Sequence, residues 1–380
     1  MRILIASDKF KGSLTGSEVA SALAEGIRNA DAGIHVDAVP VADGGEGTVA
    51  AALAVGFTAV NATVTGPTSG SVTAQFAVKD DQAIIEMAAA SGLDVLPGGI
   101  LAPLTATSRG TGDLIRAALD HGCTTIILGV GGSACTDGGA GMLQALGARL
   151  TDVNGREVAP GGAALADLAS VDLSDLDDRL THAHVVLAGD VDNPLLGERG
   201  APAVFAPQKG ATPQDVALLD AALGHYAALL VTQPGVRDVV DAPGAGGAGG
   251  VGYAAMAVLG AERRPGVEVV QELTGLAARV ASADLVITGE GSLDEQSLGG
   301  KAPIGVAQVA KDAGVPVIAI CGRTLLTPEQ LSEAGFARTY ALTDIAPDVP
   351  TAIAEAGRFV TEIGARIAAD VAAIAQGGHS

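Results

Sequence analysis

The segment DLVITGEGSLDEQSLGGKAPIGVA, residues Asp284–Ala307, joins an apolar run to a cluster of glycine and charged residues. Leu285–Ile287 has the length and β-branching expected of a buried parallel strand. Gly289–Ser292 is expected to interrupt that strand, and a helix with Pro303 in its first turn should follow. A strand, a loop and a helix in this order predict an α/β fold with a parallel sheet.

The same segment brings Glu290, Asp294 and Lys301 together shortly after the predicted strand. In open α/β sheets, ligands bind outside the carboxyl ends of the strands. Two carboxylates and an amine, beside glycines whose N–H groups a ligand can approach, suit a phosphorylated, metal-bound substrate.

The two ends of the chain share this alternation of strands and helices. We expect strands at Ile3–Ala6 and Val36–Val39, a helix from Thr15 with Glu18 as its capping-box partner, and a terminal helix at Thr351–Ala375. Short strands at Ala59–Thr65, Ser71–Val78 and Ala83–Met87 have the spacing of antiparallel hairpins. We predict two α/β domains. One is a discontinuous Rossmann-like parallel sheet from residues 1–60 and 270–380, and the other is a mixed α/β domain inserted at 61–269, with the active site in the cleft between them.

Composition restricts the class of protein. The chain has 380 residues, which favours two domains, and its 48% hydrophobic content excludes a disordered chain. The net charge of −21 with no basic stripe argues against nucleic acid and against an anionic membrane surface. No apolar run approaches the roughly 18 residues that a membrane helix needs. The three cysteines show no metal spacing, so we expect reduced thiols in a cytoplasmic protein.

Carboxylates follow many of the predicted strands. They are Asp8, Asp43, Glu46, Asp137, Asp190, Asp192, Glu290 and Asp294. One such carboxylate is usually a helix cap, but several at one sheet edge repel each other unless cations hold them. Phosphoryl transfer with Mg²⁺ uses carboxylates for the metal and cations for the phosphate charge. The candidate phosphate partners are Lys9, Lys11, Lys209 and Lys301.

Glycine-rich loops supply a second kind of candidate. Gly131–Ser133, Gly189 and Gly289–Gly291 follow predicted strands, where backbone amides bind anions or simply form tight turns. Pro243–Gly252 runs into a helix-like segment, which favours a phosphate-type loop or a hinge, with a plain flexible spacer as the alternative. Arg109 lies among Ser, Thr and Gly, where it suits carboxylate or phosphate binding or, equally, a salt bridge or helix cap. The sequence contains no P-loop, no dinucleotide fingerprint in the first strand–helix unit and no serine-hydrolase elbow.

Seven segments together resemble the type 1 glycerate kinase family, in family order over about residues 1–370. They are SDKFKGSLTGSEVA (Ser7–Ala20), PVADGGEGT (Pro40–Thr48), GVGGSACTDGGAGMLQALG (Gly129–Gly147), GDVDNPLLGERGA (Gly189–Ala201), FAPQKGAT (Phe205–Thr212), PGAGGAGGVGY (Pro243–Tyr253) and TGEGSLDEQSLGGKAPIGVA (Thr288–Ala307). The resemblance implies ATP-dependent phosphorylation of D-glycerate with Mg²⁺, giving 2-phosphoglycerate and ADP.

The resemblance also leads to a set of role hypotheses. The catalytic candidates are Asp190, Asp192, Lys11 and Lys301, and the metal candidates are Glu290 and Asp294. The substrate-binding candidates are Asp8, Asp43, Glu46, Arg109 and Asn193. The cofactor-binding candidates are Gly131, Gly132, Ser133, Gly246, Gly247, Gly249, Gly250, Gly289 and Gly291.

Alternatives stay open at this stage. A kinase of this kind could instead form 3-phosphoglycerate. A hydroxy-acid dehydrogenase would need a dinucleotide fingerprint, and a non-catalytic sensor of small acids would leave the strand-end carboxylates unexplained. Whether the protein is a monomer or a homodimer is not determined by the sequence.

Overall fold

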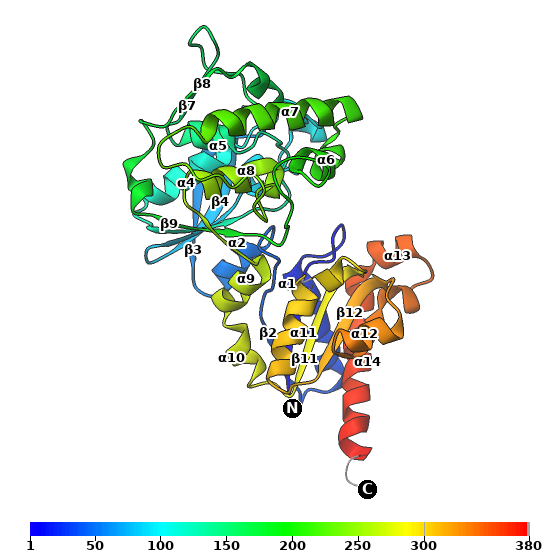
Figure 1. Cartoon of the computed structure of the whole chain (residues 1–380). Helices are drawn as coiled ribbons and strands as arrows, with labels where there is room; N and C mark the ends of the chain where they lie inside the picture. Colours follow the sequence, from blue (N-terminus) through cyan, green and yellow to red (C-terminus); the bar gives the residue numbers. More distant parts are fainter. Residues whose placement is uncertain (300, 378–380) are drawn as a thin grey trace. The chain divides into compact units, whose positions relative to one another are not determined.

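The computed structural model describes residues 1–299 and 301–377, which divide into two compact units. Unit 1 contains Met1–Asp43 and the chain from Val267 onward, and unit 2 contains Gly44–Gly266. In Figure 1 the blue N-terminal elements and the yellow-to-red C-terminal elements build unit 1 together. This division differs from the sequence-based boundaries at residues 60 and 270.

Unit 1 is built on a five-stranded sheet in the order β13-β12-β11-β1-β2. The strands are β1 (Arg2–Ser7), β2 (His35–Ala38), β11 (Leu285–Leu293), β12 (Val317–Thr324) and β13 (Phe336–Ala341), and every neighbouring pair is parallel. Because β1 lies between β2 and β11, the prediction of one parallel sheet from both chain ends is confirmed.

Both faces of this sheet are buried. Ile3 and Ile5 of β1 belong to one apolar core, and Leu4 belongs to the other. Helices α1 (Gly16–Ala30) and α14 (Ala356–Gly377) pack on the first side, whereas α10 (Leu276–Val280), α11 (Ala302–Asp312) and α12 (Pro328–Glu333) supply the second core. Strands that are apolar on both faces are typical of such parallel sheets.

Helix α1 has the predicted capping box, since Thr15 and Glu18 each accept a hydrogen bond from the other's backbone N–H. The contact between α1 and α14 depends on a glycine, because a Cβ on Gly26 would lie 1.9 Å from the carbonyl oxygen of Thr361. The predicted single helix at Thr351–Ala375 is wrong. Helix α13 (Val349–Ala354) begins earlier and is capped by Glu355, whose φ of −111° and ψ of 24° interrupt the helix before α14.

Unit 2 contains a six-stranded sheet in the order β10-β9-β6-β5-β4-β3. The strands are β3 (Thr58–Thr65), β4 (Ser71–Lys79), β5 (Gln82–Glu86), β6 (Thr125–Gly129), β9 (His184–Ala188) and β10 (Glu262–Arg264). The β3–β4 and β4–β5 pairs are antiparallel, which confirms the predicted hairpins, and the remaining pairs are parallel. The carboxyl ends of β5, β6, β9 and β10 therefore lie along one edge.

Several helices of unit 2 share one large apolar core with the sheet. They are α3 (Ala88–Ser91), α4 (Arg109–Asp120), α5 (Ala140–Ala145), α7 (Pro213–Leu230) and α8 (Gly247–Ala257). Helices α2 (Thr48–Ala54) and α6 (Ala201–Phe205) also belong to unit 2. Helix α9 (Gly266–Thr274) begins where the chain returns to unit 1, and a small β7 (Arg149–Thr151)–β8 (Ser170–Asp172) ribbon completes unit 2. Within the described part of the chain, no helix combines the length and apolar character needed to span a bilayer.

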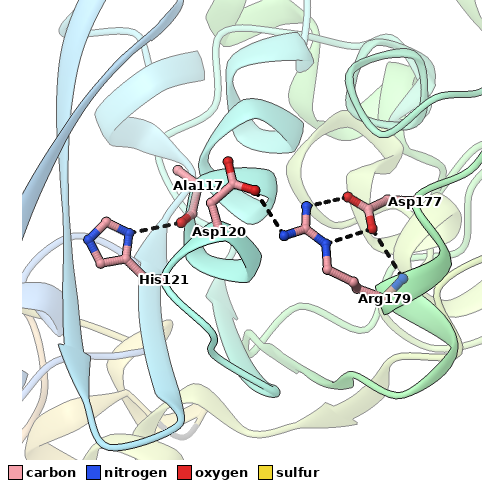
Figure 2. Close-up of polar contacts among 5 residues, drawn as sticks. All are labelled: Ala117, Asp120, His121, Asp177 and Arg179. Carbon is pink, nitrogen blue, oxygen red and sulfur yellow. Dashed lines mark hydrogen bonds and ion pairs between the residues drawn. The ribbon is translucent and has the colours of Figure 1, made fainter.

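A surface ion pair secures the end of α4. Figure 2 shows the guanidinium of Arg179 between the carboxylates of Asp120 and Asp177, at 2.8 and 2.6 Å. It also shows the ring nitrogen Nδ1 of His121 3.1 Å from the carbonyl oxygen of Ala117. Arg179, Asp120 and His121 are exposed, Asp177 is partly buried, and these residues precede the starts of β6 and β9 rather than following their carboxyl ends.

Candidate functional site

Three carboxylates of unit 1, Asp8, Asp43 and Glu290, form what we call the acidic cluster. Asp8 directly follows β1, Asp43 follows β2, and Glu290 lies in the last part of β11, so parallel pairing brings them to one edge. Burial raises the pKa of Asp8 to about 7, against a hydrogen bond from the Lys9 N–H at 2.7 Å. That value includes the smaller upward effects of the negative charges of Asp43 and Glu290.

Glu290 lies in a strand, so the prediction that Gly289–Ser292 forms a loop is wrong. Strand β11 continues to Leu293 because its pairing with β12 extends to Leu293 and Thr324. A Cβ on Gly289 would lie 2.1 Å from the carbonyl oxygen of Ile320, which explains the glycine by strand packing. Whether Gly289 and Gly291 bind a cofactor stays a prediction.

The Glu290 carboxylate is poorly satisfied. Burial raises its pKa, and both the Ser297 side chain and the Lys301 ammonium, 3.8 Å from Oε2, oppose that rise. Its Oε1 atom is buried and has no hydrogen-bond partner among the described residues. A buried, unpartnered carboxylate oxygen is costly, so this atom is suited to a cation.

The other candidates of unit 1 are arranged differently. Asp294 caps a local turn, since its Oδ1 accepts from the N–H groups of Gln296 and Ser297 at 3.0 and 3.3 Å. Lys11 is exposed, in a loop whose backbone lies against Gly291. Among residues 1–299 and 301–377, no three His, Cys, Asp or Glu side chains are grouped closely enough to hold a metal by themselves.

In unit 2, the loop Gly131–Ser133 follows β6 at the carboxyl edge of the sheet. The carbonyl of Gly132 accepts from the Leu93 N–H at 2.9 Å, and Ser133 forms an isolated β-bridge with Gly92. Gly132 is exposed with a φ of +66°, a conformation that favours glycine. Gly131 lies against Gly45, because a Cβ there would be 3.0 Å from its Cα.

Lys209, one of the candidate phosphate partners, is not the solvated surface side chain that was the alternative interpretation. Its side chain is buried, and Nζ donates to Ser133 Oγ at 2.7 Å and to the Cys135 carbonyl at 2.5 Å. Burial lowers the pKa of Lys209, and the charge of Asp137 opposes that effect. Any influence of Lys209 on a ligand would therefore act through the loop.

The carboxylate of Asp137 accepts hydrogen bonds from several backbone N–H groups and one hydroxyl. Its Oδ2 accepts from the Ser108 N–H at 2.7 Å, the Ser108 hydroxyl at 2.9 Å and the Gly141 N–H at 3.3 Å. Its Oδ1 accepts from the Gly139 N–H at 3.1 Å. These bonds connect the N-terminal ends of α4 and α5, which is the helix-cap alternative for a strand-end carboxylate.

The glycine segment around Gly246–Gly250 packs closely against two other loops. A Cβ on Gly246 would lie 2.3 Å from the Pro194 carbonyl oxygen, and one on Gly249 would lie 2.1 Å from that of Cys135. Ala248, Gly249 and Gly250 have positive φ values of 54°, 71° and 93°. Backbone packing accounts for these glycines, and a role for Gly246, Gly247, Gly249 and Gly250 in cofactor binding remains untested.

Asp190 and Asp192 lie in the loop after β9. The Asp190 carboxylate accepts from the Gly266 N–H at 2.8 Å, which attaches the loop to the start of α9. Asp192 is exposed and pairs with Arg263 of β10 at 2.5 Å. The Arg263 side chain also donates to the Val191 carbonyl at 3.2 Å, so β10 holds this loop from its side.

The remaining substrate candidates of unit 2 are spread out. The Asn193 amide donates to the Arg199 carbonyl at 2.8 Å, and Glu46 is exposed in the loop before α2. Arg109 is the first residue of α4 and lines a polar groove of about 520 Å³ with Thr65, Ser69 and Arg116. That groove lies beside the edge strand β3, whereas Gly131–Ser133 follows β6.

Two residues with clear roles at this edge were not identified from the sequence. Glu86 ends β5, and its Oε1 accepts from the N–H groups of Gly47 and Val49 at 2.9 and 2.7 Å, capping α2. Arg263 holds Val191 and Asp192. Glu86 could have been noticed as a charge at the end of an apolar strand, but nothing local marked Arg263.

Comparisons with known proteins agree along almost the whole chain. The model of the Glycerate kinase family matches residues 3–372. A protein named Glycerate 2-kinase from Escherichia coli K12 is 50% identical over 325 residues, covering 85% of each chain. A protein named Glycerate kinase from Bacillus subtilis 168 is 44% identical over 374 residues, covering 98% of each chain.

The fold agrees as well. A crystal structure described provisionally as glycerate kinase 2, from Salmonella typhimurium LT2, superposes with a TM-score of 0.84 at 45% identity and covers 99% of both chains. With a family match over nearly all its residues, this chain belongs to the glycerate kinase family and is a kinase.

Proposed function

We propose that this kinase transfers the γ-phosphoryl group of ATP to D-glycerate with Mg²⁺, giving 2-phosphoglycerate and ADP. Membership of the family supports glycerate as the acceptor. The name Glycerate 2-kinase, carried by a relative that is 50% identical, favours the hydroxyl at C2 over that at C3.

The observation that carries the proposal is the acidic cluster. Burial and like charge raise the pKa of Asp8 to about 7, and Glu290 keeps a buried oxygen with no hydrogen-bond partner in the described part of the chain. A divalent cation would relieve both conditions. Mg²⁺ typically binds to one or two carboxylates and completes its shell with water and substrate phosphates, so the lack of a three-ligand group in the described residues fits this ion.

Glu290 is the residue we expect to hold Mg²⁺, with Asp8 and Asp43 close enough to contribute charge. When bound, the ion would neutralise charge on the phosphates. Lys301, 3.8 Å from Glu290, is positioned to share that charge. Asp294 is less suited to be a ligand, because it already caps the Gln296–Ser297 turn.

The unit 2 loops supply the remaining roles. Asp190 orients the glycerate hydroxyl and accepts its proton while the oxygen bonds to the γ-phosphorus and the bond to the ADP oxygen breaks. The Gly266 N–H fixes the Asp190 carboxylate for that role. Gly131–Ser133 binds anionic oxygens, and Arg109 remains a candidate for the glycerate carboxylate.

The test is ADP release from the purified protein with ATP, Mg²⁺ and D-glycerate, with the product identified by NMR. We expect release that depends on glycerate, stops with EDTA and yields phosphorus coupled to the C2 proton. Coupling to the C3 protons would assign the other hydroxyl. No release with D-glycerate, L-glycerate or glycerol would favour a non-catalytic role as a small-acid sensor.

Asp190→Asn tests the catalytic assignment. Loss of the proton acceptor should lower kcat by about 100- to 10,000-fold with the fold intact by circular dichroism. Asp152→Asn is the control, since Asp152 only caps an exposed turn of unit 2. A near-normal rate for Asp190→Asn would remove it from catalysis.

A further inference from the structure

The side chain of Lys209 is buried, although a lysine usually keeps its charged end in water. Lys209 ends the short 3₁₀ helix Pro207–Lys209 and is 1% exposed. Unit 2 contains only two lysines, and the other, Lys79, is exposed. Burying an ammonium costs several kcal/mol unless partners compensate, so its contacts are informative.

The partners of Lys209 belong to the Gly131–Ser133 loop and its continuation. Nζ donates to the Ser133 hydroxyl oxygen at 2.7 Å and to the Cys135 carbonyl oxygen at 2.5 Å. The negative charge of Asp137 lies close enough to favour the charged form of the amine. The ammonium is therefore held by one hydroxyl and one carbonyl, and the charge of a nearby carboxylate favours it.

The hydrogen bond from Lys209 determines what Ser133 can do. A hydroxyl has one proton to donate, and its oxygen here already accepts from the ammonium. Among residues 1–299 and 301–377, the Ser133 hydroxyl has no acceptor within hydrogen-bond distance. Its backbone is fixed by the bridge to Gly92 and by the bond from the Ala134 N–H to the Ser91 carbonyl at 2.8 Å.

We infer that Lys209 is a positioning residue that polarises Ser133, so that the Ser133 hydroxyl donates a hydrogen bond to an anionic oxygen of the bound ligand. That oxygen belongs to a phosphate of the nucleotide or to the carboxylate of the hydroxy acid, which share this chemistry. A charge-assisted donor chain of this kind strengthens the final hydrogen bond. The inference rests on the proposed function in taking Gly131–Ser133 as part of the ligand site.

The experiment is a double-mutant cycle on ligand affinity. Ser133→Ala removes the hydroxyl, Lys209→Met removes the ammonium at similar length, and Lys79→Met is the matched control. Calorimetry measures the Kd of ADP with Mg²⁺ for each purified protein, and steady-state assays separate the KM of glycerate from kcat. Circular dichroism and thermal unfolding report the integrity of each fold.

We expect each single variant to weaken one ligand by about 10- to 100-fold, the size expected for a hydrogen bond to a charged group. Lys209→Met should add little further loss in the Ser133→Ala background, because both act on the same hydrogen bond. Ser133→Thr should retain affinity. A change in the ADP Kd identifies phosphate as the partner, and a change confined to the glycerate KM identifies the carboxylate.

Two results would overturn the inference. One is unchanged affinity for both ligands in Ser133→Ala. The other is that the losses of affinity add in the double variant while Lys209→Met lowers the thermal stability of the protein. Lys209 would then support the fold and not the Ser133 hydrogen bond. If Lys209→Met does not fold, Ser133→Ala and Ser133→Thr still decide whether the Ser133 hydroxyl binds the ligand, which the inference requires. ADP binding does not require turnover, so a failure of the proposed reaction is distinguished from a failure of this hydrogen bond.

Discussion

The carboxylates at the strand ends of the two units differ in how their charge is satisfied. In unit 1, Asp8 has a pKa raised to about 7 by burial and by neighbouring acids, and Glu290 has a buried oxygen that no described residue hydrogen-bonds. In unit 2, Asp137 receives backbone and hydroxyl hydrogen bonds, and Glu86 caps α2 through two backbone N–H groups. At one edge the carboxylates raise one another's pKa values, and at the other edge carboxylates fix loops.

This difference shows that a carboxylate after a parallel strand has two distinct uses. Where backbone N–H groups converge on it, the carboxylate stabilises the fold and is not available to a ligand. Where the carboxylates face each other, the fold is destabilised locally, and that cost is recovered when a cation binds. Variants of each kind should therefore change stability in opposite directions.

The largest effect is expected for Asp137→Asn. The amide keeps one acceptor but places its N–H₂ group against donors such as the Ser108 and Gly141 N–H groups. We expect the free energy of unfolding to fall by about 3–5 kcal/mol, measured by urea denaturation. Asp152→Asn, in an exposed turn with similar bonds, should cost less than about 1 kcal/mol. If both variants lose the same free energy of unfolding, burial does not determine how much Asp137 stabilises the fold.

Asp8→Asn should act in the opposite direction. An unfolded aspartate has a pKa near 4, whereas burial and the neighbouring acids raise the pKa of Asp8 to about 7 in the native state. The native state thus keeps a proton that the unfolded state has released, so stability falls as pH rises from about 4 to 7. Asparagine should remove this loss and stabilise the protein at pH 8 by about 2–3 kcal/mol.

The measurement is urea denaturation of both proteins between pH 4.5 and 8, with and without Mg²⁺. Added Mg²⁺ should reduce the loss in the wild type, because it favours the charged acidic cluster. Asp37→Asn provides the contrast, since a hydrogen bond from Arg2 lowers the pKa of Asp37 and its stabilisation is lost as pH falls. An Asp8→Asn protein with the same pH slope as the wild type would contradict the interpretation of the acidic cluster.

A smaller loss is expected for Glu86→Ala. Removal of the cap leaves the Gly47 and Val49 N–H groups without their acceptor and should cost about 1–2 kcal/mol. Glu86→Gln keeps Oε1 and should retain most of the stability. Amide hydrogen exchange at Val49 would report the change locally. If exchange there is unchanged in Glu86→Ala, the cap does not stabilise α2.

The sequence predicted the fold well where periodicity and composition act locally. The apolar runs at Ile3–Ala6 and Leu285–Ile287 identified central strands, and Thr15 with Glu18 identified the start of α1. It failed at Gly289–Ser292, because pairing with β12 extends a strand through glycines that look like a loop. The interruption at Glu355 was likewise invisible, since no proline or glycine occupies that position.

The chemistry of the sites was less predictable, because the groups that hydrogen-bond or neutralise a charged side chain are often distant from it in sequence. In the sequence, Asp8 and Asp137 are both acids that follow strands. In the structure, Asp8 lies near other acids, whereas Asp137 accepts from N–H donors. Lys209 contacts Ser133, 76 residues away, and only the fold reveals that it is buried. Residue type identified the candidates, and tertiary structure decides between a cap and a ligand.

The smallest effect is expected for Arg179→Ala, which provides the exposed reference for both edges. The Arg179 side chain is 45% exposed and pairs with Asp120 and Asp177 at 2.8 and 2.6 Å (Figure 2). Exposed pairs contribute less than about 1 kcal/mol and are screened by salt, so urea denaturation at low and high salt should give a small difference that salt reduces. Arg179→Lys keeps the charge but not the forked geometry, so its free energy of unfolding should lie between those of the wild type and Arg179→Ala. A loss as large as that of Asp137→Asn would mean that the geometry of a carboxylate's partners, and not its burial, separates the carboxylates of this protein.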